Sequence, residues 1–212
     1  LLEIDFPDPS AIPQLVSRVR QLFDLDSDPV LVANCLEADS GFRRLLRKHP
    51  GIRLPSGWDP FETCVAAILG QLVSVERGRS LVADLIDLAG KTARFRGQSI
   101  RLFPSPESVL KADLSSLKTT GHRKRALKEF SLALAEKRIS LDPTQEVEPF
   151  LNSILSIHGI GPWTAQYIAL RALRSPDAFP SSDLILARAM ELHPMEVIES
   201  MRPWRGYCAA LL

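Results

Sequence analysis

Apolar residues recur at helical spacing along most of this 212-residue chain, and this pattern limits the fold more than any other feature. Side chains three and four residues apart lie on one face of a helix, where they can pack against a core. The clearest such stripe consists of Phe61, Val65, Ile68, Leu69 and Leu72. Asp59 and Pro60 precede it, in the order expected for an N-cap and a first helical residue. Because Asn-Gly and Asp-Gly, the dipeptides most typical of β-hairpins, are absent, the sequence predicts an all-α fold.

The same spacing predicts a series of short helices. We expect them over residues 11–23, 29–37, 40–48, 60–72, 106–118, 122–137, 146–157, 162–174, 183–191, 194–200 and 203–212. A further apolar stripe over 81–89 ends at Gly90, which can stop a helix. The 16 prolines fall mostly between these segments, as expected for short helices joined by short loops. Residues 92–104 are less regular, and we expect a long loop there.

The composition excludes several classes of protein. Hydrophobic residues make up 45% of the chain and charged residues 24%, which is typical of a folded globular protein. No apolar run approaches the ~18 residues that a membrane helix needs, and the acidic, proline-containing first ten residues are unlike a signal peptide. Cys35, Cys64 and Cys208 are too few and too scattered for a disulfide framework or a cysteine-rich metal site, so we expect buried, reduced thiols.

The net charge of +1 means that any binding to nucleic acid must come from local patches and backbone groups. Basic residues form two clusters. The first consists of Arg43, Arg44, Arg47, Lys48 and Arg53, and the second is the segment 118–128, which contains Lys118, Arg123, Lys124, Arg125 and Lys128. Such clusters are usually solvated faces, but either could contact phosphates. The segment 121–125 also follows a candidate helix cap, Gly121, and could place amide groups near a phosphate.

Residues 155–165, LSIHGIGPWTA, form the most informative segment of the chain. An amphipathic helix precedes it, and Pro162 is suited to begin a second helix. Gly159 and Gly161 predict a tight turn that exposes backbone N–H groups beside those at the start of the second helix. Such a turn can bind one phosphate without reading any base, with Ile160 anchored in the core. The alternative is an ordinary helix–turn–helix connection in which Gly159 caps the first helix.

This segment resembles the helix-hairpin-helix motif of the DNA glycosylase superfamily, whose usual form is Leu-Pro-Gly-hydrophobic-Gly followed by a helix with Thr-Ala. His158 stands where proline is usual. The resemblance implies that Gly159, Gly161 and Thr164 form a phosphate-binding hairpin. It also implies that no cofactor is required, and that a structural Na⁺ or K⁺ could be held by the main-chain carbonyls of Leu155, Ile157 and Ile160.

The superfamily places a catalytic aspartate some twenty residues after the hairpin, at the start of a helix. Asp183 lies 22 residues after Gly161 and follows Pro-Ser-Ser. A carboxylate that faces the C1′ atom of a nucleotide stabilises the oxocarbenium-like sugar formed when the glycosidic bond breaks. Considered alone, Asp183 could equally be a helix N-cap.

Further segments resemble the bacterial alkylbase branch of the superfamily, DNA-3-methyladenine glycosylase II. They are Gly57–Glu62, Ile68–Val75, Leu102–Pro106 and Arg202–Tyr207, and the resemblance extends from about residue 15 to the C-terminus. It implies a two-lobed fold, in which residues 58–175 form the lobe with the hairpin and residues 7–57 plus 176–212 form the lobe with Asp183. Residues 1–6, with alternating apolar side chains, are expected to be the last strand of an N-terminal β-rich domain that the chain lacks.

The branch also implies roles for residues near the aspartate. Trp163 and Tyr167, four residues apart on one helical face, would line the pocket for a base flipped out of the duplex, and the alternative is a pair of core aromatics. Leu72, with Gln71, would enter the gap that the base leaves, although Leu72 also fits the core stripe. Bifunctional relatives carry a lysine where Trp163 stands, so no lyase activity is expected.

The sequence therefore predicts a monofunctional base-excision repair enzyme that hydrolyses alkylated purines of the 3-methyladenine type from double-stranded DNA. A positively charged methylated purine leaves as a neutral base, so no second carboxyl group is needed to protonate it, and one carboxylate can suffice for the reaction. We expect a monomer in the bacterial cytoplasm, associated with the nucleoid and without membrane contact. Two alternatives stay open: a non-enzymatic helix-hairpin-helix module that only docks on DNA, and a helical scaffold with no affinity for DNA.

Overall fold

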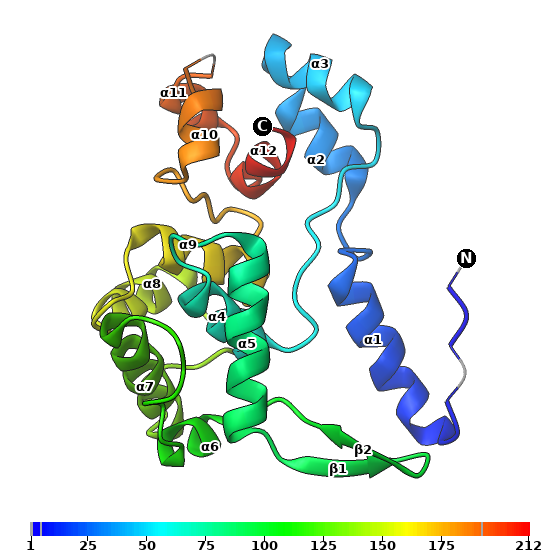
Figure 1. Ribbon diagram of the computed structural model, residues 1–212. Helices are drawn as coiled ribbons and strands as arrows, with labels where there is room; N and C mark the ends of the chain where they lie inside the picture. Colours follow the sequence, from blue (N-terminus) through cyan, green and yellow to red (C-terminus); the bar gives the residue numbers. More distant parts are fainter. Residues whose placement is uncertain (1, 5, 192) are drawn as a thin grey trace.

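The structure, a computed structural model, describes residues 2–4, 6–191 and 193–212. Figure 1 shows two groups of helices, with α1 (Ile12–Leu22) at their side after the 3₁₀ turn Pro9–Ala11. The lower group contains α4 (Pro60–Leu69), α5 (Val75–Ala89), α6 (Pro106–Lys111), α7 (Gly121–Ala135), α8 (Val147–Leu155) and α9 (Pro162–Arg171). The upper group contains α2 (Pro29–Leu36), α3 (Ser40–Lys48), α10 (Leu184–Ala189), α11 (Met195–Ser200) and α12 (Arg205–Leu211). The mostly helical fold predicted from the apolar spacing is confirmed.

Many of the helices begin at a polar cap that the sequence supplies. Asp59 accepts a hydrogen bond from the Glu62 amide at 2.9 Å, and Pro60 opens α4, so the cap predicted there is confirmed. Thr120 accepts from the Arg123 amide and caps α7, so Gly121 is the first residue of this helix rather than its cap. A side-chain cap of this kind stabilises a helix by about 1 kcal/mol, because it satisfies an amide that the helix itself leaves free.

Helix α4 lies at the centre of the lower group and packs against α5, α7 and α9. Val65, Ile68 and Leu69 have no exposed surface, and each such side chain contributes about 1.5–3 kcal/mol on burial. In the upper group α12 packs against α3, where Phe42 and Tyr207 are buried. The residue boundaries given above for the two lobes stay a prediction.

Residues 92–104 are not a long loop, and here the prediction was wrong. β1 (Thr92–Phe95) and β2 (Gln98–Arg101) form an antiparallel hairpin. Its turn residues Arg96 and Gly97 have φ angles of 49° and 78°, the left-handed conformation that two-residue hairpin turns favour. An arginine at the first turn position gives no Asn-Gly signal. The strand residues are also mostly exposed, so no alternation of polarity marks them.

Other expectations differ from the structure at the ends of elements. Residues 2–4 and 6 form no strand, since the described residues offer no neighbouring strand for pairing, and residues 1 and 5 lie outside the described residues. The helix predicted over 60–72 ends at Leu69, and the helix predicted over 106–118 ends at Lys111. The stripe over 81–89 is the second part of α5, which begins at Val75, whereas the other predicted helices agree with the structure to within three residues at each end.

The three cysteines are free, as expected, with Cys64 and Cys208 buried and Cys35 half-buried. Burial raises the pKa of the Cys64 thiol well above its ordinary value and that of Cys208 to about 12, so both stay protonated at neutral pH. Within the described residues, no helix combines the length and the apolar character needed to cross a membrane.

A network of ion pairs joins α11 and α12 to the segment that follows α9. Arg205, only 8% exposed, binds the Asp177 carboxylate through two nitrogens at 3.0 and 2.9 Å and also contacts Glu199. Arg202 contacts the same two carboxylates, but its side chain is 49% exposed. Solvent screens the exposed pairs more strongly, so the contacts of Arg205 should dominate the network.

We expect Arg205→Met to lower the free energy of unfolding by about 3 kcal/mol, because it leaves Asp177 without its buried partner. Arg202→Met is the matched control and should cost less than about 1 kcal/mol, since its pairs are exposed. Urea unfolding followed by circular dichroism measures both variants. Equal losses would show that burial does not decide the strength of this network.

Candidate active site

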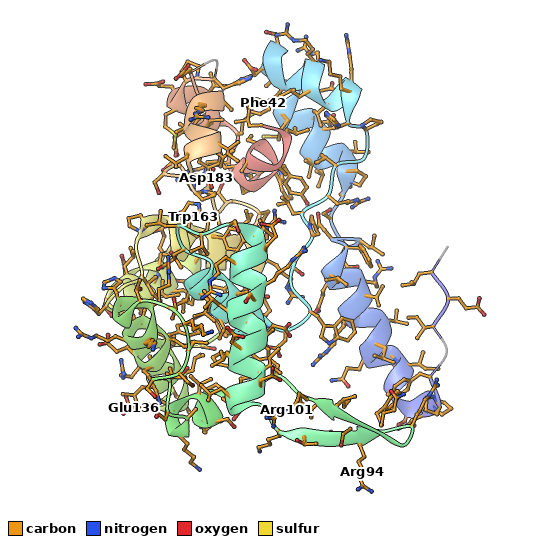
Figure 2. All side chains as sticks on the ribbon, viewed as in Figure 1. Phe42, Arg94, Arg101, Glu136, Trp163 and Asp183 are labelled. Atoms are coloured by element: carbon orange, nitrogen blue, oxygen red, sulfur yellow. The ribbon has the colours of Figure 1, made fainter. Side chains whose placement is uncertain are left out.

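Asp183 is the N-cap of α10 and also receives a hydrogen bond from the lower group of helices. Its Oδ1 atom accepts from the amides of Ile185 and Leu186 at 2.8 and 3.3 Å. Its Oδ2 atom accepts from the indole Nε1–H of Trp163, on α9, at 2.8 Å. Figure 2 shows Trp163 and Asp183 at the junction of the two groups of helices. Asp183 is therefore a helix cap, but capping uses only one of its two carboxylate oxygens.

The surroundings of Asp183 favour its charged form. Burial raises the pKa of Asp183, but the hydrogen bonds from Trp163 and from the amides of Ile185 and Leu186 lower it by more. The pKa of Asp183 therefore lies below its ordinary value. At neutral pH the side chain is a carboxylate, and its negative charge is fixed in position by three donors.

Trp163 and Tyr167 stack on each other, with ring centroids 5.2 Å apart and planes inclined by 20°. One turn of α9 separates them, as their spacing predicts. Both side chains are half-buried, whereas Ile168 and Ala169 on the same helix have no exposed surface. The aromatic pair thus lies at the edge of the core rather than inside it.

A cleft of about 210 Å³ opens beside Asp183 and Tyr167. Its other walls come from α9, α10, α12 and the loop before α10. The residues that form them are Leu170, Arg171, Pro180, Ile185, Leu186, Gly206, Ala209, Ala210 and Leu212. The wall from α12 is missed by sequence reasoning, because small apolar residues carry no chemical signal. Trp163 contributes to this site through its hydrogen bond to Asp183. Charge, aromatic surface and an apolar cleft therefore meet at one place.

The turn between α8 and α9 has a geometry suited to binding a phosphate. Gly159 has a φ of +86°, and a Cβ atom there would lie 2.8 Å from the Ala126 side chain, so the position requires glycine. Ile160 is 5% exposed and anchors the turn in the core, as expected. Gly161 is the N-cap of α9, and apart from its two chain neighbours no residue has an atom within 4 Å of where its Cβ would be. Ser156, not Gly159, caps α8, so Gly159 does not have the capping role that the ordinary-connection alternative gave it, and phosphate binding at this turn stays a prediction.

The departure from the usual hairpin motif creates a contact of its own. His158 Nε2 lies 3.2 Å from Nδ1 of His122, at the start of α7. The His158 amide donates to the carboxylate of Glu129 at 3.1 Å. Polar contacts of His158 therefore attach the hairpin to α7. A proline at this position has no amide N–H and could not make the hydrogen bond to Glu129.

Gln71 and Leu72, in the turn after α4, have different surroundings. Leu72 is 97% exposed, so it is not a core residue although it fits the apolar stripe. Gln71 Nε2 donates to the Gly159 carbonyl at 3.0 Å and to Thr164 Oγ1 at 2.8 Å. The Gln71 side chain is engaged with the hairpin, which leaves Leu72 as the candidate wedge.

Several side chains of the two basic clusters bind backbone carbonyls and serve the fold. Arg43 donates to Glu37, Arg53 to Asp24 and Ser27, Arg123 to Gln71, Lys124 to Ser115, and Lys128 to Leu110 and Ala112. Arg44, Arg47 and Arg125 are exposed. The clusters are thus only partly free to meet an anion.

Main-chain oxygens at the hairpin could hold a cation. Among the described residues, no group of three or more His, Cys, Asp or Glu side chains could hold a metal ion. The Ile157 carbonyl accepts from the Ile160 amide at 3.1 Å, whereas the carbonyls of Leu155 and Ile160 accept no hydrogen bond within the described chain. Two of the three carbonyls named for the cation are thus free of hydrogen bonds, and oxygen is the ligand that hard cations prefer, but the cation itself stays a prediction.

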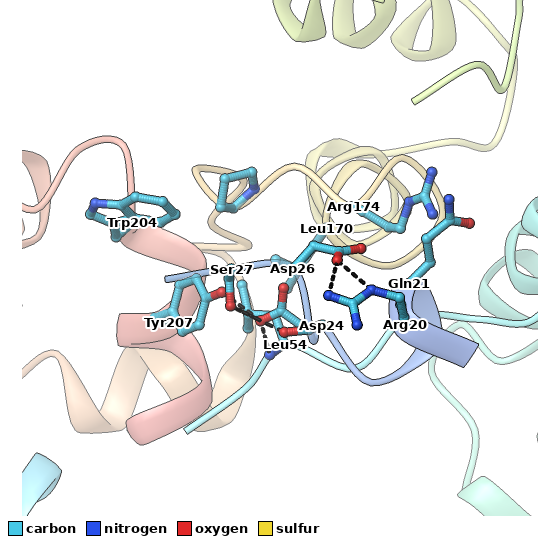
Figure 3. Close-up of a pocket in the computed structure, with 11 residues that line it drawn as sticks. Arg20, Gln21, Asp24, Asp26, Ser27, Leu54, Leu170, Arg174, Trp204 and Tyr207 are labelled. Atoms are coloured by element: carbon cyan, nitrogen blue, oxygen red, sulfur yellow. Dashed lines mark hydrogen bonds and ion pairs between the residues drawn. The ribbon is translucent and has the colours of Figure 1, made fainter. Parts of the chain in front are cut away.

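A second cavity, of about 300 Å³, shares Leu170 with the cleft. Figure 3 shows Asp24 in it, where the Tyr207 hydroxyl and the Ser27 hydroxyl donate to its carboxylate. The Leu54 amide donates to the same oxygen at 3.0 Å. Burial raises the pKa of Tyr207 well above its ordinary value, so the phenol stays protonated and keeps this contact. The contact holds α12, one wall of the cleft, against the turn after α1.

Comparisons with known proteins show the family to which the chain belongs. The AlkA N-terminal domain family matches residues 1–59. DNA-3-methyladenine glycosylase 2 of Escherichia coli strain K12 is 34% identical over 201 residues, which cover 92% of this chain and 69% of that protein. The chain belongs to the DNA-3-methyladenine glycosylase 2 family. A second relative, a probable bifunctional transcriptional activator/DNA repair enzyme AlkA of Mycobacterium tuberculosis, is 34% identical over 90% of this chain, which spans about 40% of that protein.

Solved structures show the fold of this family member. A 3-methyladenine DNA-glycosylase from Archaeoglobus fulgidus has a TM-score of 0.76 and 21% identity, and the match covers 98% of this chain and 74% of that one. An 8-oxoguanine glycosylase/lyase from Clostridium acetobutylicum has a TM-score of 0.79 and 18% identity, and the match covers 97% and 75%. The helix-hairpin-helix DNA glycosylase fold expected from the sequence is confirmed. The roles expected for individual side chains stay predictions.

We expect Trp163→Phe to raise the pKa of Asp183, because it removes the indole N–H that favours the carboxylate and keeps an aromatic ring. The depressed pKa stabilises the fold above the pKa of the unfolded chain, and this contribution is lost as pH falls through the folded-state pKa. The variant should therefore lose that contribution at a higher pH than the wild type. Carbon-13 NMR titration of the Asp183 carboxyl group measures the shift. An unchanged pKa would contradict the part assigned to Trp163.

Proposed function

We propose that this chain excises alkylated purines from DNA as a base-excision repair glycosylase. One observation carries the proposal above all others: the Asp183 carboxylate is held ionised by hydrogen bonds and lines an apolar cleft together with Tyr167. Family membership and the hairpin at residues 159–161 support the same reading. DNA is the partner, and we propose a monomer in the bacterial cytoplasm near the nucleoid.

The reaction follows from a fixed negative charge and an aromatic surface. When an N-glycosidic bond breaks, positive charge develops on the sugar, and a carboxylate facing C1′ stabilises it without forming a bond. The electron-rich faces of Trp163 and Tyr167 attract a cationic base, which a 3-methylated adenine is. Such a base leaves as a neutral molecule, so the leaving group needs no second carboxylate to protonate it. A cleft with few polar groups selects for charge and shape more than for one hydrogen-bond pattern.

The hairpin supplies the contact with DNA. Gly161 faces open space at the start of α9, so a phosphate can approach the free amides there. A monovalent cation held by the carbonyls of Leu155, Ile157 and Ile160 would add positive charge beside that phosphate. The target base must leave the duplex before it can reach Asp183, and the exposed side chain of Leu72 is suited to fill the gap.

The alternative, a module that docks on DNA without catalysis, explains the hairpin but not the ionised carboxylate at the cleft. Asp183 would then serve only as the cap of α10. A variant that keeps the fold and removes the charge separates the two functions.

We expect no lyase activity, because Trp163 occupies the position of the lysine that attacks C1′ in bifunctional relatives. No lysine lines the cleft within the described residues. Borohydride treatment during turnover should therefore trap no covalent adduct between protein and DNA. Efficient trapping would show that another amine reaches C1′ and would contradict the monofunctional assignment.

We expect Asp183→Asn to slow excision of 3-methyladenine from methylated duplex DNA by about 100-fold or more, because it removes the charge that stabilises the sugar cation. The asparagine amide has one oxygen, so it cannot accept from both Trp163 and the α10 amides. The loss of one such hydrogen bond should cost about 1 kcal/mol of stability. Single-turnover release of the base measures the rate, and thermal unfolding measures the fold. A folded variant that excises at a near wild-type rate would leave Asp183 as a cap and favour the docking module.

A further inference from the structure

The backbone at Leu72 is strained, and something must hold it. Leu72 has a φ of +53°, a conformation that residues other than glycine adopt rarely and at a cost of about 1–3 kcal/mol. Its side chain is 97% exposed, so packing of that side chain cannot hold the turn. The contacts that fix the conformation must therefore come from neighbouring residues.

Those contacts converge on Gln71. Its side-chain Nε2 donates to the Gly159 carbonyl at 3.0 Å and to the Thr164 hydroxyl at 2.8 Å. Its own carbonyl accepts from the guanidinium of Arg123, on α7. Thr164 is 2% exposed, so the hydrogen bond between the two side chains is shielded from water. Gln71 is thus tied to the hairpin by its side chain and to α7 by its backbone.

We propose that Gln71 is a positioning residue that makes the hairpin and Leu72 one rigid unit. A phosphate seated on the hairpin then fixes the place of the Leu72 side chain relative to the base stack. The inference rests on the proposed function, because it assumes that the hairpin binds DNA and that Leu72 enters the duplex. Gln71 then holds Leu72 in place, whereas the sequence predicts that Gln71 itself enters the gap that the base leaves.

The rigid unit should matter only where a base pair has to be opened. A lesion paired in a duplex needs an apolar side chain to fill the gap it leaves. A lesion that is bulged out of a duplex has no pair to break, yet it presents the same phosphates to the hairpin. Loss of Gln71 should therefore affect the paired lesion and spare the bulged lesion.

The test compares Gln71→Met with the wild type on these two substrates. Methionine keeps the length of the side chain and removes both hydrogen bonds, which should slow single-turnover excision of the paired lesion about 10-fold. Excision of the bulged lesion should change less than about 2-fold. Gln145→Met is the matched control, because Gln145 Nε2 also donates to two carbonyls, those of Ser140 and Asp142, in a loop away from the hairpin. Gly161→Asp places a carboxylate before the hairpin and should weaken binding of both substrates alike.

A double-mutant cycle with Leu72→Ala tests whether Gln71 acts through Leu72. If it does, Gln71→Met adds nothing once the leucine side chain is gone. Additive losses, or equal losses on paired and bulged lesions, would overturn the proposal. The fluorescence of 2-aminopurine placed beside the lesion increases when the base pair opens, whether or not the base is excised.

A wild-type chain that increases this fluorescence but excises no base would count against the proposed function alone, and Gln71→Met should still reduce the increase. An equal increase in fluorescence with the wild type and with Gln71→Met would overturn the positioning role.

Discussion

The shared carboxylate of Asp183 joins the two groups of helices at the point where the cleft opens. One oxygen accepts from the amides of Ile185 and Leu186 in the first turn of α10, and the other accepts from Trp163 on α9. Because each oxygen serves a different element, neither helix can shift without losing a hydrogen bond to a charged group, which is stronger than a neutral one. The orientation of the Trp163 and Tyr167 stack and the position of α10 both depend on this anion.

Other polar contacts hold the segment that leads from α9 to Asp183. Gln166, one residue before Tyr167 on α9, accepts from the Phe179 amide at 3.0 Å. Two residues before Phe179, Asp177 is bound by the buried guanidinium of Arg205. The loop is thus fixed to α9 at one point and to α12 at another before it reaches Asp183. A carboxylate at the end of a loop can be placed accurately only if the loop itself is held in this way.

The parts of the site that sequence could predict are those with a short-range signal. Helical spacing, the Asp59 cap and the hairpin glycines each depend on residues close in the chain. The spacing from the hairpin to Asp183 indicates a site only through the resemblance to the DNA glycosylase superfamily, because Asp183 considered alone is a helix cap. The β-hairpin was missed because its turn uses Arg96 and its strands are exposed. The hydrogen bonds from Gln71 to the hairpin and the wall of the cleft that α12 forms depend on contacts between distant parts of the chain. No local pattern encodes such contacts, and only the folded structure shows them.

The hydrogen bond from Trp163 also limits the chemistry that Asp183 can perform. A donor that stabilises the carboxylate lowers its pKa and so makes it a weaker base. A weak base takes a proton from water less readily, but its negative charge is fully present throughout the neutral range. That combination is poor for a reaction that requires deprotonation of the nucleophile at an early stage. It suits a reaction in which the leaving base departs by itself and the main demand on the protein is to stabilise the positive sugar. The same indole that limits Asp183 as a base stacks on Tyr167, so one side chain sets both the charge of the carboxylate and the aromatic surface beside it.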